Sequence, residues 1–358
     1  MTEKKKRMIL FAIFLLLIVS CKIKKQDSGE LVSSEVGNVK HVTVTNITKD
    51  DIQWHISVLA SDSMQGRLSA SSDEIHAAQY IKEKFISLGL KAFNDNYYQT
   101  FPIPSGRYII NGELQFGNFN GNRHEKKSKT LPLSSQNVVA YLETSDPKHE
   151  NEYIVIGAHY DHIGTRKIGD SVFINNGADD NASGTAGLLE IAEKLRYTKK
   201  LKHNVIFAAF GSEELGLIGS EFFCDNPPVP IEKIKLMINM DMIGRMDSSK
   251  HAYIGTIETN DQLNTVVDVM KKTHPHINSV VSFDNFIRYS DHSSFYDIHV
   301  PVMAFTTGLH NAYHSPADTL GSINCEGEKL LLDFIYDLVI SPAMDNCIRS
   351  FTSSELNP

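Results

Sequence analysis

The chain alternates stretches of helical periodicity with short apolar runs. Between residues 73 and 88, apolar side chains recur at spacings of three and four and are followed by Gly89, which predicts an amphipathic helix with a glycine stop. Further helices are predicted at residues 183–196, 216–223, 262–272 and 326–340. Continuous apolar runs predict strands at residues 137–142, 153–158, 205–210, 235–240 and 300–306.

This order of elements predicts the fold class. Near-continuous apolar strands are typical of sheets that are covered on both faces. Their alternation with helices predicts an α/β fold with a mixed, mostly parallel central sheet and helices on both faces. Residues 42–350 form one predicted domain, with a short excursion of hairpins or loops at 101–136 and a tail at 351–358.

The first 41 residues are predicted to serve in export and anchoring and not to belong to the folded domain. Lys4 to Arg7 are basic and precede an apolar run at residues 8–19, which is typical of a secretory signal peptide. The run is shorter than the roughly 20 residues of a transmembrane helix. Residues 18–21 resemble a bacterial lipobox, which implies a signal peptide at 1–20, a lipid anchor on Cys21 and a polar tether at 21–41. The expected location is the bacterial cell envelope, membrane-anchored and periplasmic or surface-facing; ordinary secretion is the alternative.

Composition narrows the function classes. The 358 residues are 41% hydrophobic, enough for a large core without disulfide bonds. The net charge is −8 and no long basic block occurs in the body of the chain, so nucleic acid is excluded as the main partner. Beyond Cys21, three cysteines remain, and the sequence leaves open whether Cys325 and Cys347 form a bridge.

Polar side chains follow the predicted strands where the strands end. Ligands of open α/β sheets bind beyond the carboxyl ends of the strands, so these residues are candidates for one site. Histidine and carboxylate side chains without cysteine favour zinc or a similar ion in a reactive site. The segments are residues 159–162, 177–181, 211–214 and 313–318, together with Asp241.

Motifs for other chemistries are absent from the sequence. It contains no His-Glu-x-x-His zincin helix, no Walker loop and no Gly-x-Gly-x-x-Gly fingerprint. Ser183 is not in a Gly-x-Ser-x-Gly nucleophile elbow. The expected chemistry therefore depends on the metal ligands.

Six segments resemble the zinc-dependent exopeptidase family of the bacterial leucyl aminopeptidases. That family also contains glutamate carboxypeptidase II and, more distantly, the glutaminyl cyclases. The resemblance runs in order across most of residues 55–340, and it implies the zinc aminopeptidase (phosphorylase/hydrolase-like) form of the α/β fold. The segments are GAHYDHIG (157–164), NNGADDNASGTAGLLEIAEKL (175–195), FAAFGSEELGLIGS (207–220), NMDMIGR (239–245), YSDHSSF (289–295) and YHSPADTL (313–320).

The resemblance implies two Zn²⁺ ions about 3.5 to 4 Å apart. His159 and Asp241 are the expected ligands of one ion, Glu214 and His314 of the other, and Asp180 is expected to bridge them. Co²⁺ and Mn²⁺ are acceptable substitutes for these ligands.

Three further residues receive catalytic roles from the resemblance. Glu213 is the expected general base, which takes a proton as a metal-bridging hydroxide attacks the peptide carbonyl. Asp161 is expected to accept the other N–H of His159. Tyr313 is expected to stabilise the oxyanion.

The expected reaction is aminopeptidase hydrolysis of peptides with a free N-terminus. Carboxylates around the metals suit an α-ammonium group, and the predicted domain leaves little room for the appended domains of the glutamate-type carboxypeptidases. Two alternatives stay open: a glutaminyl-cyclase-like zinc acyltransferase, and a non-catalytic binding module on the same scaffold.

Overall fold

The computed structural model describes residues 46–104, 107–110, 113–116, 133–247, 252–256, 261–277 and 289–350. All of them belong to one compact unit, Thr43–Pro358. The signal peptide, Cys21, the tether and the 351–358 tail lie outside the described residues, so those predictions stay predictions. Within the described parts, no helix is both long and apolar enough to cross a membrane.

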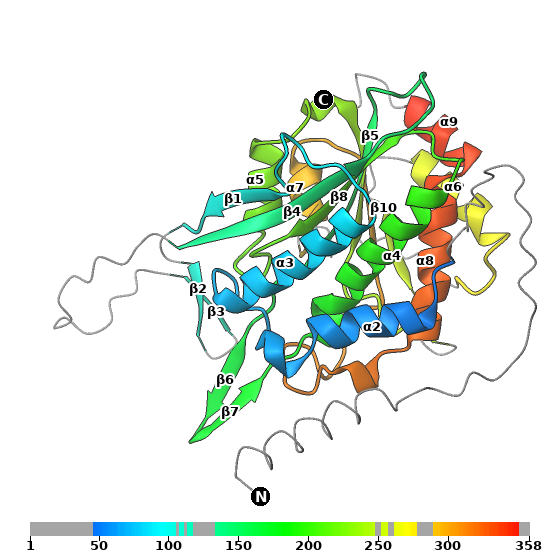
Figure 1. Ribbon diagram of the computed structural model, residues 1–358. Coiled ribbons are helices and arrows are strands. Elements are labelled where there is room, and N and C mark those ends of the chain that lie inside the picture. Colours follow the sequence, from blue (N-terminus) through cyan, green and yellow to red (C-terminus); the bar gives the residue numbers. More distant parts are fainter. Residues whose placement is uncertain are drawn as a thin grey trace, which may run out of the picture. The chain divides into compact units, whose positions relative to one another are not determined.

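A seven-stranded mixed sheet forms the centre of the fold (Figure 1). Four neighbouring central strands, β8, β5, β9 and β11, are parallel, while β1, β4 and β10 pair antiparallel towards the edges. This confirms the predicted α/β class with a mostly parallel central sheet. In spatial order the strands are β1 (Tyr98–Pro102), β4 (Ser134–Leu142), β8 (Asn204–Phe210), β5 (Tyr153–His159), β9 (Ile234–Met240), β11 (Val302–Thr306) and β10 (Tyr253–Thr256).

Helices cover both faces of this sheet because its strands are apolar on both sides. In β5, Ile154 and Ile156 belong to one hydrophobic cluster and Val155 to another, since successive side chains of a strand point to opposite faces. The first face is covered by α2 (Lys49–Leu59), α3 (Ser72–Ser87), α4 (Gly184–Tyr197) and α8 (Cys325–Val339). The second face is covered by α5 (Ile218–Asp225) and α7 (His292–Asp297).

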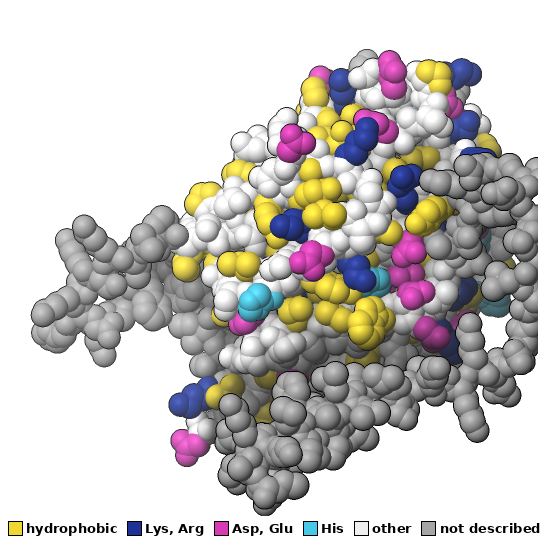
Figure 2. Space-filling view, viewed as in Figure 1, with side chains coloured by type: hydrophobic (Ala, Val, Ile, Leu, Met, Phe, Trp, Pro, Cys, Tyr) yellow, Lys and Arg dark blue, Asp and Glu magenta, His cyan; other side chains and the backbone are white. Residues whose placement is uncertain are grey.

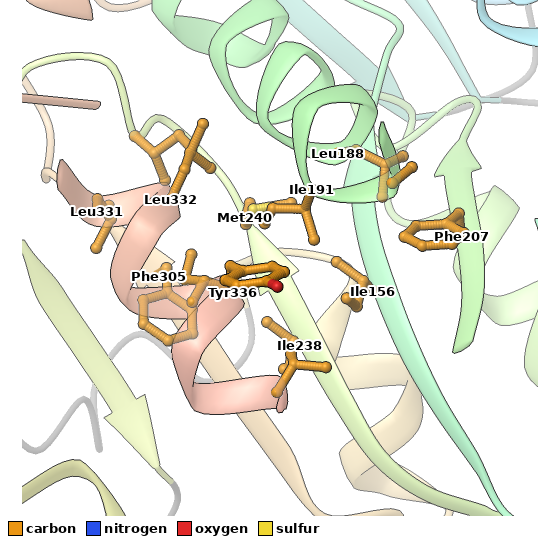
Figure 3. Close-up of a cluster of buried hydrophobic side chains, with 14 of the residues drawn as sticks. Ile156, Leu188, Ile191, Phe207, Ile238, Met240, Phe305, Leu331, Leu332 and Tyr336 are labelled. Atoms are coloured by element: carbon orange, nitrogen blue, oxygen red, sulfur yellow. The ribbon is translucent and has the colours of Figure 1, made fainter. Parts of the chain in front are cut away.

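The largest part of the core lies between the sheet, α4 and α8. Figure 3 shows Ile191 of α4 and Tyr336 of α8 near Ile156 and Ile238 of the sheet, and Leu188 of α4 beside Phe207. All six side chains are buried. Because this core holds the helices against the strands, it also fixes the loops that leave the carboxyl ends of the strands.

The predicted elements are present with small shifts of their ends. The predicted helix at 73–88 is α3, which Ser71 caps by accepting hydrogen bonds from two backbone amides, and Gly89 follows it with φ +67°. Elements that periodicity did not predict include α2, α7, α9 (Pro342–Ser350), the strands β1 and β10, and a hairpin of β6 (Thr165–Ile168) and β7 (Ser171–Ile174). The 101–136 excursion contains a hairpin of β2 (Arg107–Ile110) and β3 (Glu113–Phe116). Cys325 and Cys347 are both free.

The face formed by α2, α3 and α4 is chemically mixed. Figure 2 shows Lys and Arg side chains interspersed with Asp and Glu, and hydrophobic side chains between them. Exposed hydrophobic residues of these helices include Trp54, Ile75 and Ile86. Such scattered apolar side chains are normal for a protein surface.

Candidate metal centre

The sequence-predicted ligands converge at the carboxyl ends of neighbouring parallel strands. His159 is the last residue of β5, and Asp241 follows β9 directly. Glu213 and Glu214 follow β8 after a two-residue turn. Asp180 lies in the irregular turn Ala178–Ser183 that leads into α4. His314 comes from the loop between β11 and α8, so five separate segments build one site.

The backbone around these residues is held in uncommon conformations. Ser212, Met242 and His314 are non-glycine residues with φ of +59°, +56° and +51°. Such left-handed residues cost energy and concentrate at functional sites. Gly177 has φ +58°, and a Cβ there would lie 2.2 Å from the carbonyl oxygen of Asp180, so only glycine allows this approach.

One group of potential ligands consists of His159, Asp180 and Asp241. His159 Nε2 lies 3.4 Å from Asp180 Oδ1 and 3.4 Å from Asp241 Oδ1. Its other ring nitrogen, Nδ1, lies 3.2 Å from the backbone carbonyl oxygen of Asp161. The inner nitrogen of the ring therefore faces two carboxylates, and the outer nitrogen has a fixed partner.

A second group consists of His162, Asp180, Glu214 and His314. His314 Nε2 lies 3.1 Å from Asp180 Oδ2 and 3.1 Å from Glu214 Oε2. His162 Nδ1 lies 2.7 Å from Glu214 Oε1 and 3.7 Å from Asp180 Oδ2. Both carboxylates thus present oxygens to imidazole nitrogens from two sides.

Asp180 belongs to both groups. Its Oδ1 faces His159 and its Oδ2 faces His314, which is the arrangement of a carboxylate that bridges two cations. Asp180 Oδ2 and His314 Nε2 are buried and form no hydrogen bond with any described residue, although they lie only 3.1 Å apart. Two ligands of one ion approach each other in this way. With nitrogen and oxygen donors and no thiolate, the residues fit two zinc ions.

The electrostatics also call for bound cations. Burial opposes charge on His314, but Glu214 and Asp180 raise the pKa of His314 to about 10. Burial likewise opposes charge on His159, and the carboxylates of Glu213 and Asp241 raise its pKa well above the ordinary value. Although burial and Asp180 act in the other direction, His314 and His162 lower the pKa of Glu214 to about 2. The carboxylate groups of the site outnumber its imidazole rings, so even protonated imidazoles would leave negative charge there. The site therefore favours added positive charge.

Glu213 lies beside this cluster without belonging to either ligand group. Its Oε2 is 3.9 Å from His159 Nε2, and its side chain is 11% exposed. Burial, and after it the neighbouring carboxylates of Glu214 and Asp241, raise the pKa of Glu213 well above its ordinary value, against the effect of His159. A carboxylate with a raised pKa next to a metal site is suited to take up a proton.

The carboxylate of Asp161 has a different partner from the one expected. Its Oδ1 is 3.8 Å from His159 Nδ1, whereas the backbone carbonyl of the same residue is closer. The carboxylate accepts hydrogen bonds from Ser69 Oγ and from the backbone amides of Glu213 and Glu214. Asp161 thus positions the adjacent glutamates, and its backbone carbonyl lies closer to the histidine than its carboxylate does.

Tyr313 lies against the second group. Its ring stacks on the ring of His314 at 3.8 Å between centroids and an interplanar angle of 19°. The residue is 40% exposed, so part of its side chain faces solvent. Burial, and then the charge of Asp180, raise the pKa of Tyr313 above its ordinary value, which keeps the phenol protonated and able to donate a hydrogen bond.

The sequence interpretation places His162 around the site but not among the ligands, and it assigns no role to Arg67. His162 is fully buried and lies among the ligands, three residues after His159, so the spacing in the His-Tyr-Asp-His segment was the available signal. Arg67 is also fully buried. It donates hydrogen bonds to the carbonyl oxygens of Leu59, Tyr160, Asn176 and Gly177. Because all four partners are backbone groups and three of them lie 93 to 110 residues away along the chain, no local pattern identifies Arg67.

The fold and this site define a class of protein, the metallohydrolases built on a doubly covered α/β sheet. The family model of Peptidase family M28 matches residues 137–339, more than half of the chain. The chain therefore belongs to Peptidase family M28. This confirms the peptidase family that the sequence segments indicate.

Comparison with individual proteins agrees with this assignment. Aminopeptidase YwaD of Bacillus subtilis strain 168 is 29% identical over 220 residues, which are 56% of this chain and 45% of the relative. The uncharacterized protein YfbL of Escherichia coli K12 is 26% identical over 74% of this chain and 79% of its own length. The solved structure of BSAP, a zinc aminopeptidase from Bacillus subtilis, has a TM-score of 0.62 at 17% identity, covering 82% of this chain and 94% of that one. This chain spans less than half of YwaD, and the likeness to BSAP concerns the fold.

Proposed function

We propose that the chain is a di-zinc aminopeptidase that removes N-terminal residues from peptides. The observation that supports this most directly is the position of Asp180, whose two oxygens face the two ligand groups. His159 and Asp241 hold one ion, while Glu214 and His314 hold the other. Membership of Peptidase family M28 supports peptide-bond hydrolysis as the reaction.

The roles of the protein groups follow from their positions. Zinc held by these residues would supply a Lewis acid that polarises the peptide carbonyl and makes bound water more acidic. Glu213, adjacent to the ligands but not part of either group, takes the proton from the attacking water and delivers it to the leaving amine. Tyr313 donates a hydrogen bond to the oxygen of the carbonyl under attack.

The preference for a free N-terminus follows from the charge around the site. Glu213, Asp241 and Asp291 lie close enough to influence one another electrostatically. Carboxylates beside the metal ligands favour the positively charged α-ammonium group of an unblocked peptide. The relatives named as aminopeptidases support the same preference.

For the location, we propose an exported lipoprotein anchored to the cell envelope through Cys21. The basic residues before the apolar run at 8–19, and the lipobox-like residues 18–21, support this. Peptides and the membrane are then the partners of the chain.

The function is tested by mass spectrometry of a peptide panel incubated with the purified full chain. The panel contains free, N-acetylated and N-terminal-Gln peptides, with and without zinc and with a chelated control. We expect stepwise loss of N-terminal residues from the free peptides only, and no loss after chelation. Loss of one ammonia from the Gln peptides without shortening identifies a cyclase, and unchanged peptides in every sample contradict the enzymatic proposal.

A further inference from the structure

A second cluster of histidine and carboxylate side chains lies at the amino ends of the central strands, whereas the candidate metal centre lies at their carboxyl ends. His149 and Glu152 precede β5, and His203 precedes β8, so all three are at the amino ends of these strands. Asp345 comes from α9. Since β5 and β8 each have seven residues, their length separates the cluster from the candidate metal centre by roughly 20 Å. The two sites share no residue.

The four side chains are arranged with two faces. Glu152 Oε2 lies 2.5 Å from His149 Nδ1 and 3.3 Å from His203 Nδ1. On the other side, Asp345 Oδ1 lies 3.2 Å from His149 Nε2 and 3.4 Å from His203 Nε2. The two imidazole rings are 4.4 Å apart between centroids. Glu152 therefore faces the Nδ1 atoms of both rings, and Asp345 faces the Nε2 atoms of both rings.

The backbone holds this arrangement independently of any ligand. The amide of Glu152 donates a hydrogen bond to the carbonyl of His149, closing a turn that presents both side chains on one side. Asn204, next to His203, donates from its backbone amide to the carbonyl of Glu152 and from its side chain to the carbonyl of Glu150. The turn is thus fastened to the beginning of β8, where His203 is located.

Burial and charge make the pair of rings unusual. His149 is 4% exposed and His203 is 2% exposed. Neither ring nitrogen of His203 forms a hydrogen bond with any described residue, despite the carboxylate oxygens near both. Glu152 on one side and Asp345 on the other therefore face a pair of buried imidazole rings.

We propose that His149 Nδ1, His203 Nδ1 and the carboxylate of Glu152 bind one divalent transition-metal ion, distinct from the ions of the peptidase centre. These three residues offer ligand atoms that all lie within 4.8 Å of one another. Two imidazoles and a carboxylate are a ligand set that zinc accepts, with water completing the coordination. Asp345 faces the outer ring nitrogens and orients both rings, as carboxylates commonly do for metal-bound histidines.

The proposed ion has a structural role. It joins the turn before β5 to the beginning of β8, and through Asp345 it couples both to α9. An ion that binds only the folded chain raises its stability in proportion to the logarithm of the ion concentration over the dissociation constant. Zinc should therefore stabilise the protein even when the peptidase centre is disabled.

The test counts zinc ions per chain. The purified full chain is stripped of metal, reloaded with Zn²⁺, freed of excess and analysed by inductively coupled plasma mass spectrometry. We expect Glu152→Gln and His203→Ala each to bind one ion fewer than the wild type while peptidase activity is retained. Glu150→Gln, which removes an exposed carboxylate from the same turn, should bind as many ions as the wild type.

A second measurement keeps the proposal testable if His203→Ala does not fold. Glu152→Gln preserves the size of the side chain, and its melting temperature should rise less on zinc addition than that of Glu150→Gln. The comparison is repeated in an Asp180→Ala background, where the peptidase centre is impaired, and the difference of one ion should persist. Equal zinc content in wild type, Glu152→Gln and His203→Ala overturns the proposal and leaves the cluster as a pair of histidine–carboxylate contacts.

Discussion

The carboxylate of Asp318 accepts hydrogen bonds from the backbone amides of both Asp179 and Asp180, each at 3.0 Å from Oδ2. Asp318 is fully buried, and the guanidinium of Arg245 donates to its other oxygen. The same guanidinium donates to the carboxylate of Asp179. A residue four positions after His314 therefore orients the bridging carboxylate without facing either ligand group itself.

Replacing Asp318 by Asn should weaken metal binding without unfolding the chain. The amide group of Asn presents N–H where the backbone amides or Arg245 need an acceptor, so the turn around Asp180 shifts. Loss of such an outer contact typically lowers metal affinity by about 10- to 100-fold. Zinc titration against a competing chelator measures the change. Asp268→Asn, an exposed substitution on α6 (Asp261–Lys271), should leave the affinity unchanged, and equal affinities in the two variants would contradict this role.

The sequence predicts most of the sheet because most of its strands are continuous apolar runs. Five apolar runs give five of the seven sheet strands, and five helical patterns give α3, α4, α5, α6 and α8. The edge strands β1 (YQTFP) and β10 (YIGT) are short and contain polar residues or glycine, so they lack a continuous apolar run. Their places in the sheet depend on pairing with distant strands, which periodicity does not record.

Chain order made the site residues near strand ends predictable, and the sequence motifs added Asp180 and His314. His159 and Asp241 follow apolar runs directly, and Glu213 and Glu214 follow one after two residues. Arg67 precedes α3 instead, and its role depends on four carbonyl groups that meet only after folding. The carboxylate of Asp161 is similar, since its amide partners come from the turn after β8 rather than from its own strand.

Glu213 and Glu214 offer a matched pair of substitutions. Glu213→Gln should retain both metal ions and lose turnover by about 10² to 10⁴-fold, the usual contribution of a general base. Glu214→Gln should lose metal as well, because its carboxylate faces His162 and His314. Zinc content and kcat measured on the same samples separate the two cases. A fully active Glu213→Gln variant would show that another group takes the proton.

Glu74 predicts a pH dependence of stability. Burial, and then the charge of Asp161, raise its pKa from 4.5 to about 8, although Ser135 Oγ and the amide of Ala70 donate hydrogen bonds to its carboxylate. Between pH 4.5 and pH 8 the folded chain keeps a proton that the unfolded chain has lost, so this residue makes stability fall as pH rises. Glu74→Gln should remove that decline.

The measurement is the melting temperature from pH 5 to pH 9. The melting temperature of the wild type should fall from pH 5 to pH 9, and that of Glu74→Gln should fall by a few degrees less. The scale of the difference follows because about 1 kcal/mol moves the melting temperature of a large domain by roughly 2–4 °C. Glu83→Gln, an exposed substitution on the same helix, should run parallel to wild type. Parallel curves for Glu74→Gln as well would mean that Glu74 is ionised in the folded protein.

The proposed lipid anchor predicts the fractionation of Cys21 variants. If Cys21 is lipidated, the chain sediments with membranes, and Cys21→Ser releases it because the thiol that receives the lipid is gone. Cys224→Ser changes a cysteine of α5 and should fractionate as the wild type does. Membrane sedimentation of Cys21→Ser would contradict the anchor and favour retention by another route.

We expect substitution of Arg67 to reduce the stability of the folded chain more than any other single substitution. Burial lowers its pKa to about 10, so the guanidinium is still charged at neutral pH and is held by four carbonyl oxygens. Arg67→Met has a similar volume but no donor and leaves four carbonyls unsatisfied, each costing about 1–3 kcal/mol if no water replaces the donor. Arg67→Lys keeps the charge but lacks the planar fork that reaches separate carbonyls.

Urea unfolding of both variants distinguishes the charge from the hydrogen bonds. If the bonds matter most, Arg67→Lys loses almost as much free energy of unfolding as Arg67→Met, whereas a role of charge alone leaves Arg67→Lys close to wild type. Arg196→Lys, an exposed substitution at the end of α4, is the control and should unfold with the wild-type midpoint. Because two of the carbonyls belong to Asn176 and Gly177, directly before the turn of Asp180, a loss in Arg67→Lys should be accompanied by weaker zinc binding.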